Sequence, residues 1–276
     1  MEDIKSPHDL ITEETVVLAL QQDKGLKARL KSWIIEDFAK KGDNYASTIT
    51  SVKVFFSIDE INHMVSYIVK LNPFKRGNPM EKFTESIFYK ETSFLTVLLP
   101  KLNEKLSEAG QVHLRIPKCY YYKLENKKEV VFLEDLRAYG FVMHDRLVAF
   151  DVAHTVLILH ELARLHASSM LLLQDQTETN QDFDMKEEYP FLKEFFTSEI
   201  SPKSDFSQII IDAIEHGGNL AAKFSEYQFI KEWLQKQNIR KILQDQLKPL
   251  LPFSSICHGD CWINNVLFRY LYNSVD

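Results

Sequence analysis

The residues best suited to chemistry lie in the segment Cys257–Phe268. There Asp260 is followed five positions later by Asn265, within an otherwise apolar stretch. In phosphotransferases an aspartate of this kind accepts the proton of the attacking hydroxyl, while an asparagine on the same loop binds magnesium. Both groups must converge on one phosphoryl group, which a short loop achieves more readily than two distant segments. The spacing alone suits a polar turn between two strands equally well, so a catalytic loop requires further partners.

A lysine and a glutamate earlier in the sequence are candidate partners for this loop. Lys70 lies between apolar neighbours at the end of a β-branched run, and Glu91 follows 91 − 70 = 21 positions later in a helical pattern. A strand lysine is most often a solvated edge residue. In kinases, however, a strand lysine paired with a helix glutamate directs its ammonium group at the nucleotide phosphates. Lys70, Glu91, Asp260 and Asn265 stand in the order that a kinase requires, two in each predicted lobe.

A histidine-containing helical segment is the main competitor of another chemical class. The stretch His160–His166 approaches a zinc-protease motif, but Arg164 occupies the position of the second ligand. The two histidines are 166 − 160 = 6 residues apart, which is about 240° around a helix, so they do not share a face. We interpret both as structural residues.

The cysteines give no catalytic or disulfide framework. Cys119, Cys257 and Cys261 are too few for a disulfide scaffold and favour a reducing compartment. Cys257, His258 and Cys261 form at most half of a zinc site, since no second Cys or His pair follows. The N-terminal residues lack the apolar core of a secretory signal, and no run of about 18 apolar residues occurs. We therefore expect a cytoplasmic protein with no membrane partner.

Composition narrows the function classes further. The 276 residues are 45% hydrophobic and 26% charged with a net charge of −6, which excludes fibrous and disordered classes. The mild acidity gives no whole-molecule reason to bind nucleic acid. Only eight glycines occur, and none has the spacing of a dinucleotide fingerprint, a Walker loop or a serine nucleophile elbow. A nucleotide site here must use another design.

Hydrophobic periodicity predicts the elements that position these groups in the first half of the chain. Helical spacing alternates there with short β-branched runs. The predicted elements are a helix over 13–40 stopped by Gly42, a hairpin of 49–57 and 64–71 turning at Asp59–Glu60, a helix over 81–98 with Pro100 just beyond its end, and strands within 112–122 and 129–134.

The second half is predicted to be mainly helical. Residues 135–140 form a connection, and the tail turns strand-like near 255–257 and 265–270. The helices are predicted over 151–173, capped by Asp151 and buried through Val152, Val156, Leu159, Ala163, Ala167 and Met170, and over 191–199, 207–222 and 226–246, with a solvated loop at 174–190.

These motifs together resemble the ecdysteroid kinase-like family, also described as choline-kinase-like, within the protein-kinase-like fold. They follow the family's order over nearly the whole chain. The matching segments are Lys41–Ser47, Ile68–Pro73, Phe88–Glu91 with Leu99–Leu102, Phe132–Leu136, Leu162–Ser169 and His258–Asn265.

The resemblance implies an α+β, two-lobed protein-kinase-like fold. An N-terminal helix and an antiparallel-sheet, nucleotide-binding lobe would occupy residues 1–134, and a helical lobe residues 135–276. The implied activity is ATP- and magnesium-dependent phosphorylation of a hydroxyl on a small molecule, an ecdysteroid-like steroid or another lipophilic alcohol.

The resemblance also implies roles for individual residues. His166 would stabilise the long helix rather than take part in chemistry. Gly42, Asp43, Asn44, Tyr45 and Ser47 would cover the phosphates; Lys70 and Glu91 would form the phosphate-binding ion pair; Glu134, Asp135 and Leu136 would bind adenine through backbone groups; Asp260 would be the catalytic base and Asn265 a magnesium ligand.

One departure from the family pattern bears on activity. Family members carry a downstream Ile-Asp-Phe-Gln type segment, whose aspartate is the main magnesium ligand, followed by helices that complete the acceptor pocket. The sequence ends at Asp276 without it, so we expect a truncated chain of weak or no activity, with apolar surface exposed at Leu267, Phe268 and Leu271. A non-catalytic pseudokinase or ligand-binding protein of the same fold is the alternative, and a plain helical interaction domain fits the ordered set least well.

Overall fold

The computed structural model describes residues 6–36, 47–73, 81–193, 205–246, 248, 254–271 and 274–275. The chain forms two compact units, one comprising Met1–Arg76, Thr84–Gln181 and Ser255–Asp276, the other Gly77–Phe83 and Asp182–Ser254. The first combines an antiparallel sheet with helices and the second is helical, which confirms the predicted α+β class.

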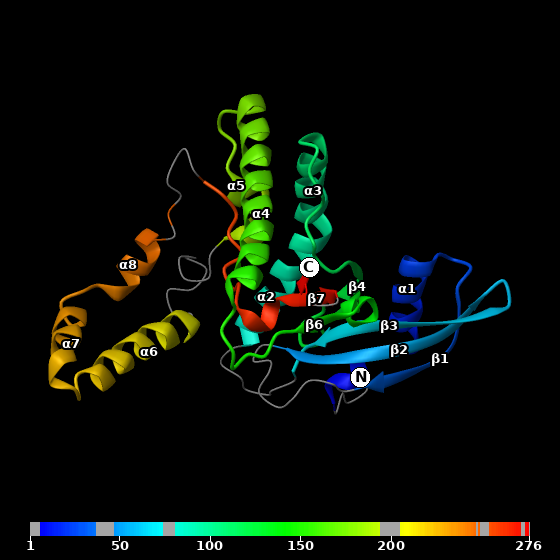
Figure 1. The fold of residues 1–276 in the computed structure, drawn as a ribbon, viewed down its shortest axis with the longest axis horizontal. Coiled ribbons are helices and arrows are strands. Elements are labelled where there is room, and N and C mark those ends of the chain that lie inside the picture. Colours follow the sequence, from blue (N-terminus) through cyan, green and yellow to red (C-terminus); the bar gives the residue numbers. More distant parts are fainter. Residues whose placement is uncertain are drawn as a thin grey trace. The chain divides into compact units, whose positions relative to one another are not determined.

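The first unit contains two antiparallel sheets (Figure 1). The larger has five strands in the order β1-β2-β3-β5-β4, and the smaller has three in the order β6-β7-β8. Its helices are α1 (Glu13–Lys24), most of α2 (Glu81–Ser93), α3 (Leu99–Glu108) and α4 (Val152–Thr179); its strands are β1 (Arg29–Glu36), β2 (Thr48–Ile58), β3 (Ile61–Leu71), β4 (Cys119–Lys123), β5 (Val130–Glu134), β6 (Phe141–Met143), β7 (Leu267–Leu271) and β8 (Ser274–Val275).

The predicted hairpin is confirmed as β2 and β3. Ile58 pairs with Ile61 across a two-residue turn, and the turn residues Asp59 and Glu60 have φ of 45° and 67°. Positive φ at both central positions is the type I′ geometry, which matches the twist of the flanking strands. The turn thereby fixes the register of the hairpin, in which Lys70 lies opposite Ile49.

The single helix predicted over 13–40 is wrong in its second half. Helix α1 ends at Lys24, because Gly25 at its C-cap has a φ of 86°. Residues 29–36 form β1, in which Trp33 and Ile35 pack against the core while Ile34 is exposed. The helix-like spacing of the apolar residues masked this alternation, whose period of two belongs to a strand.

Helices cover both faces of the five-stranded sheet. Successive residues of a strand point to opposite faces, so one strand, β5, contacts a different helix on each face. On β5, Val130 and Phe132 belong to the core that includes Leu20 of α1. Val131 and Leu133, which alternate with them along the strand, pack with Phe88 of α2 in a second cluster.

The face covered by α1 contains a buried polar contact. The Tyr67 hydroxyl donates a 2.9 Å hydrogen bond to Asp23 Oδ2. Burial and this neighbouring carboxylate raise the pKa of the Tyr67 phenol, so it remains a neutral donor.

The helix predicted over 81–98 does not stop before Pro100. Helix α2 ends at Ser93, a five-residue π-helical turn spans Phe94–Leu98, and α3 begins at Leu99 with Pro100 in its first turn. Pro100 cannot donate an N–H to the preceding turn, and the π-helical turn lies immediately before it. Of the strand predicted within 112–122, only the last part forms, as the beginning of β4 (Cys119–Lys123).

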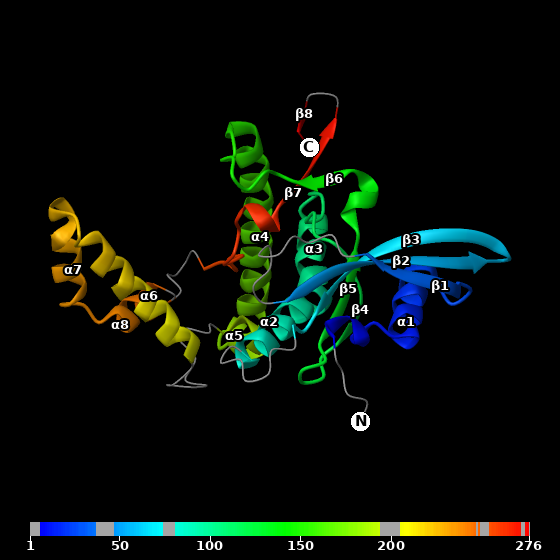
Figure 2. The ribbon, with the colours of Figure 1, turned by 90° about the horizontal axis from the view of Figure 1, so that it is seen from below.

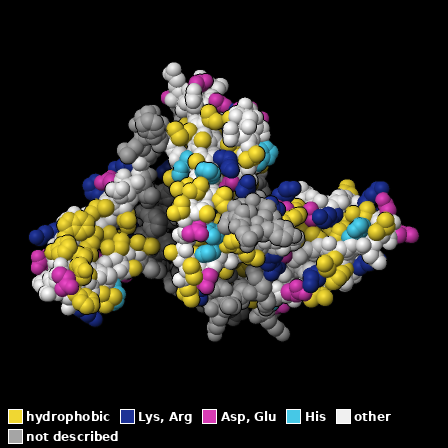
Figure 3. Space-filling view, viewed as in Figure 1, with side chains coloured by type: hydrophobic (Ala, Val, Ile, Leu, Met, Phe, Trp, Pro, Cys, Tyr) yellow, Lys and Arg dark blue, Asp and Glu magenta, His cyan; other side chains and the backbone are white. Residues whose placement is uncertain are grey.

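Helix α4 is longer than predicted and buries a different face. It continues through residues 174–179, which the sequence assigned to a loop. Val152, Val156 and Leu159 of the predicted stripe are exposed, and Figure 3 shows hydrophobic and histidine side chains along this surface. Ser168 and Ser169 can be buried instead because each hydroxyl donates to a carbonyl of its own helix. The buried residues are His154, Leu165, Ser168, Ser169 and Leu172.

Helix α4 is also long and apolar enough to cross a membrane, the only such helix among the described residues. A single helix of this kind is weak evidence for a membrane span. It runs alongside α3 in both views (Figures 1 and 2), and its Asp175 forms a 2.5 Å ion pair with Lys105 of α3. These contacts attach it to the first unit.

The second unit consists of short helices. The helix predicted over 207–222 is confirmed as α6, whereas the one predicted over 226–246 is interrupted between α7 and α8. The segment predicted over 191–199 contributes the end of a 3₁₀ turn at Pro190–Leu192, and its residues from 194 lie outside the described part. The helices are α5 (Met185–Glu188), α6 (Asp205–Ala221), α7 (Gln228–Leu234) and α8 (Ile239–Gln246).

Two adjacent glycines of α6 provide a test of the contact between α6 and α7. A Cβ at Gly218 would lie 2.4 Å from Leu234 Cδ1, whereas nothing lies within 4 Å of one at Gly217. Gly217→Ala should stabilise the unit by about 0.5–1 kcal/mol through helix propensity. Gly218→Ala should lose that gain and lower stability by about 1 kcal/mol, because Leu234 must move. Thermal and urea unfolding compare the two variants, and equal stabilisation by both would contradict the close approach.

Candidate active site

Lys70 faces α2 for a reason set by the strand itself. Its neighbours Val69 and Leu71 are buried in the core on the α1 face, so the intervening side chain points to the opposite face. There the Lys70 ammonium forms an ion pair with Glu91 Oε1. The two side chains are 25% and 27% exposed, which leaves the ammonium accessible to a ligand. The structure thus brings together the lysine and glutamate singled out from the sequence.

Helix α2 is held where Glu91 can reach the sheet. Phe88, one helical turn earlier, packs against β5 with an exposure of 1%, and the Thr92 hydroxyl donates 2.7 Å to the Phe88 carbonyl. Cys119 lies partly buried in the same cluster. Burial and the field of Glu91 raise the pKa of its thiol to about 11, so Cys119 is a neutral packing residue.

The connection after β5 is fixed by its own side chains. Glu134 Oε2 accepts a 3.2 Å hydrogen bond from the Lys118 amide. Asp135 is buried and accepts from Ser66 Oγ at 2.6 Å and from the Arg137 guanidinium at 2.7 and 2.8 Å. Leu136 begins a 3₁₀ turn that Asp135 caps. The side chains of Glu134 and Asp135 are therefore engaged within the protein. The Glu134 amide also donates 2.8 Å to the Lys118 carbonyl, and the Asp135 carbonyl accepts from the Ala138 amide at 3.2 Å, so only the remaining backbone groups of this segment could contact a ligand.

The electrostatics of Asp135 follow from these contacts. Burial alone would raise its pKa, but the hydrogen bonds from Arg137 and Ser66 outweigh burial, so the pKa lies below its ordinary value. Ser66 lies on β3, four residues before Lys70. The ionised Asp135 thus ties the connection to the strand that positions the lysine.

The loop that follows residue 257 brings Asp260 and Asn265 into direct contact. Asn265 Nδ2 donates to the Asp260 carbonyl at 2.8 Å and to Asp260 Oδ2 at 2.9 Å. Gly259 allows the turn with a φ of 78°, and the Asp260 amide donates 3.2 Å to His258 Nδ1. Asp260 and Asn265 are both exposed. The five-residue spacing noted in the sequence therefore closes a small ring whose carboxylate and amide face solvent together.

Both ends of this loop are attached to α4. At its entry the Ile256 amide donates a 2.9 Å hydrogen bond to Ser169 Oγ. At its exit Phe268 of β7 is 2% exposed, with its ring 4.6 Å from that of His154. The expected exposure of Phe268 is therefore wrong, because α4 and the residues before it enclose the ring; Leu267 is 37% exposed, and the side chain of Leu271 lies outside the described part.

The loop has donors that suit magnesium. Mg²⁺ is usually held by one or two carboxylates or amide oxygens together with phosphate oxygens and waters. Because Asn265 uses its nitrogen to bind Asp260, its Oδ1 remains available as a ligand. No group of three or more His, Cys, Asp or Glu that could hold a metal occurs among the described residues. A metal here would fit only as an ion shared with a bound nucleotide.

The structure does not test the predicted residues of the turn over the phosphates. Gly42, Asp43, Asn44 and Tyr45 lie outside the described residues, and Ser47 immediately precedes β2. The assignment of these residues to a turn over the phosphates therefore stays a prediction.

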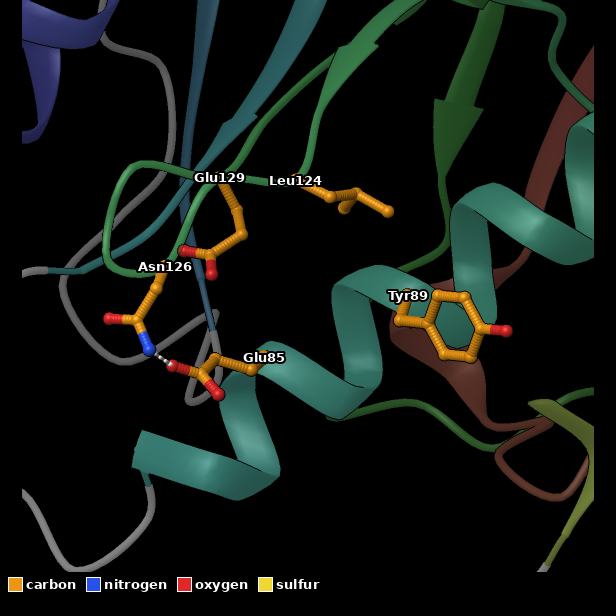
Figure 4. Close-up of a pocket in the computed structure, with 5 residues that line it drawn as sticks. All are labelled: Glu85, Tyr89, Leu124, Asn126 and Glu129. Atoms are coloured by element: carbon orange, nitrogen blue, oxygen red, sulfur yellow. Dashed lines mark hydrogen bonds between the residues drawn. The ribbon is translucent and has the colours of Figure 1, made fainter. Parts of the chain in front are cut away.

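A cavity of about 270 Å³ lies elsewhere, between α2 and the turn from β4 to β5 (Figure 4). Asn126 donates to Glu85 across it, and the buried Glu129 carboxylate accepts 2.7 Å from Asn72. The cavity contains none of the predicted site residues, and of its lining only Tyr89 lies in a motif segment noted in the sequence, Phe88–Glu91. Its lining residues are Glu85, Tyr89, Leu124, Asn126 and Glu129.

Comparison with known proteins identifies one family. The family model described as the ecdysteroid kinase-like family matches residues 41–275, which is 275 − 41 + 1 = 235 of the 276 residues. Curated proteins and solved structures gave no significant match.

The Asp135 contact gives a stability test with a defined pH dependence. Arg137→Met removes the main partner of a buried carboxylate and should lower the free energy of unfolding by about 3 kcal/mol near neutral pH. This value is at the lower end for buried ion pairs, because Arg137 is partly exposed. The pKa of Asp135 is depressed in the folded state, so its stabilising effect is present above the unfolded value of about 3.9 and is lost as pH falls below it. Urea unfolding should therefore show the gap between wild type and variant narrowing towards about pH 3.

Lys27→Met is the matched control, because it breaks an exposed pair with Asp59. This change should alter stability by no more than about 0.5 kcal/mol at any pH. A gap for Arg137→Met that stays constant with pH would contradict the assigned role of Asp135.

Proposed function

The chain belongs to the ecdysteroid kinase-like family, and on that premise we propose that it transfers the γ-phosphoryl group of ATP to a hydroxyl of a small lipophilic alcohol, such as a steroid. The family makes it a small-molecule kinase-like protein of α+β fold. The observation that carries the proposal is the contact of Asn265 Nδ2 with both the carbonyl and the carboxylate of Asp260.

Asp260 is proposed as the catalytic base. Its Oδ2 is held by Asn265, while Oδ1 has no hydrogen-bond partner in the described part of the chain. An acceptor hydroxyl placed against Oδ1 would lose its proton to the carboxylate as its oxygen attacks the γ-phosphorus. The Asn265 contact keeps the carboxylate in one rotamer, which lowers the cost of reaching the reactive geometry.

Lys70 and Glu91 are proposed to hold the nucleotide. The ammonium would bind the α- and β-phosphates, and Glu91 would aim it. The backbone of Glu134, Asp135 and Leu136 would bind adenine, consistent with the engagement of the Glu134 and Asp135 side chains within the protein. This assignment makes residues 1–134 the nucleotide-binding lobe and residues 135–276 the helical lobe.

Magnesium use is implied in general by the family. When bound, the ion would neutralise charge on the transferring phosphoryl group. Asn265 Oδ1 is the ligand that the chain itself would supply. A small-molecule acceptor, with no nucleic acid or membrane partner and a cytoplasmic location, remains part of the proposal.

A second candidate is nucleotide binding without transfer. It is favoured by the lack of a three-group acidic or histidine cluster among the described residues, because a second strong metal ligand would normally accompany Asn265. Calorimetry that shows magnesium-dependent ATP binding without any product would favour this candidate over the kinase.

Two substitutions separate chemistry from binding. Asp260→Ala should lower phosphoryl transfer from labelled ATP to a panel of steroid alcohols by about 10²–10⁴-fold, because the base is removed, with the ATP dissociation constant within about threefold of wild type. Lys70→Met should instead weaken ATP binding about tenfold, through loss of a charged contact to phosphate.

Glu104→Ala is the control for loss of a carboxylate, because this residue is exposed on α3, outside the turn that sets the register of the hairpin. It should change neither the rate of phosphoryl transfer nor the dissociation constant of ATP. Undiminished turnover in Asp260→Ala would refute the catalytic assignment, and unchanged ATP affinity in Lys70→Met would refute the nucleotide site.

A further inference from the structure

Strand β7, which leaves the catalytic loop, is held against the start of α4 by two side chains. Phe268 and Tyr270 are two positions apart and so project to the same face. Phe268 packs edge-on to His154, with an interplanar angle of 84°. The Tyr270 hydroxyl lies 3.0 Å from His154 Nε2 and 3.3 Å from His144 Nδ1. One phenol therefore joins two histidines from different segments.

The direction of these hydrogen bonds follows from Asp151. Hydrogen bonds from the His154 amide and imidazole lower the pKa of this carboxylate, so it is ionised and can only accept. His154 Nδ1 lies 2.7 Å from Asp151 Oδ1 and must carry the proton, which leaves Nε2 of the neutral ring as an acceptor. Tyr270 then donates to His154 Nε2, and its oxygen accepts from the Nδ1–H of His144.

We propose that Tyr270 and His154 are positioning residues for the loop that carries Asp260 and Asn265. The strand begins 267 − 265 = 2 residues after Asn265, so the position of Tyr270 fixes the exit of the loop. Its entry is fixed independently at Ser169. The proposal rests on the catalytic role of the loop, but the position of the loop can be measured without turnover.

The relay encloses the His154 imidazole on several sides. The groups that contact His154 in the described part of the chain are Asp151 on the helix cap, His144 before α4 and Tyr270 on β7; Phe150 and Phe268 complete its surroundings. Loss of the Tyr270 hydroxyl removes the hydrogen bonds to both histidines, so it should loosen the loop at its exit only.

Trp262 within the loop is a direct reporter of this change. It is 44% exposed, and Trp33→Phe with Trp233→Phe leaves it as the only tryptophan of the three. In this parent, Tyr270→Phe should raise the acrylamide quenching of Trp262 about twofold at neutral pH, because the exit of the loop loses the hydrogen bonds that hold it.

The variants isolate the hydroxyl and the imidazole. Tyr270→Phe keeps the ring and removes only the hydroxyl. His154→Leu removes the imidazole that holds this hydroxyl and should raise the quenching of Trp262 to a similar extent, whereas His160→Leu, at an exposed histidine of the same helix, should leave it unchanged. Circular dichroism confirms that each variant is folded. Equal quenching of the parent and Tyr270→Phe, or of the parent and His154→Leu, would overturn the proposal.

Turnover provides the second arm. Tyr270→Phe should lower kcat about tenfold, as expected for a lost hydrogen bond that orients the loop, with KM for ATP unchanged within about twofold. If the quenching of Trp262 rises in Tyr270→Phe but neither the parent nor any variant turns over substrate, the kinase activity is refuted and the positioning role stands. If the parent turns over substrate and Tyr270→Phe changes neither the quenching of Trp262 nor kcat, the positioning role is refuted and the kinase activity stands.

Discussion

The candidate site depends on helix α4, because this one element holds both ends of the loop that carries Asp260 and Asn265. Ser169 binds the amide that enters the loop, and His154 packs against the strand that leaves it. These residues are 169 − 154 = 15 positions apart, about 22 Å along a helix at 1.5 Å per residue. An exposed polar loop has little packing of its own to restrict its conformations. Fixing its ends to one helix restricts them without burying the carboxylate that must meet a substrate.

The second constraint is the alternation of side chains in the sheet. Val69 and Leu71 face α1, and Lys70 between them must face α2. A slip of one residue between β2 and β3 would turn the lysine into the apolar core and expose its neighbours. The two-residue turn at Asp59–Glu60 prevents that slip by setting the register. A backbone turn with no chemical role therefore determines the face of the sheet on which Lys70 lies.

The sequence predicted which residues of the candidate site lie in contact better than it predicted the elements that support them. Asp260 with Asn265, and Lys70 with Glu91, were recognisable because the chemistry restricts both residue type and order, and the structure places each pair in contact. Periodicity failed where two patterns overlap, as in β1, whose apolar spacing also suits a helix. It failed again on α4, whose buried face is determined by Ser169 and by hydrogen bonds to distant segments, neither of which a hydrophobic pattern reveals.

The contacts that define the site geometry are polar and join residues far apart in sequence. Ser66 with Asp135, Ser169 with Ile256 and His154 with Tyr270 are separated by 69, 87 and 116 positions. Apolar contacts are non-directional and tolerate small shifts, whereas a hydrogen bond weakens steeply with distance and angle. The apolar clusters can therefore stabilise the fold while these few polar contacts determine its local geometry. Substitutions that preserve volume but remove one polar atom should accordingly disturb the site far more than they disturb folding.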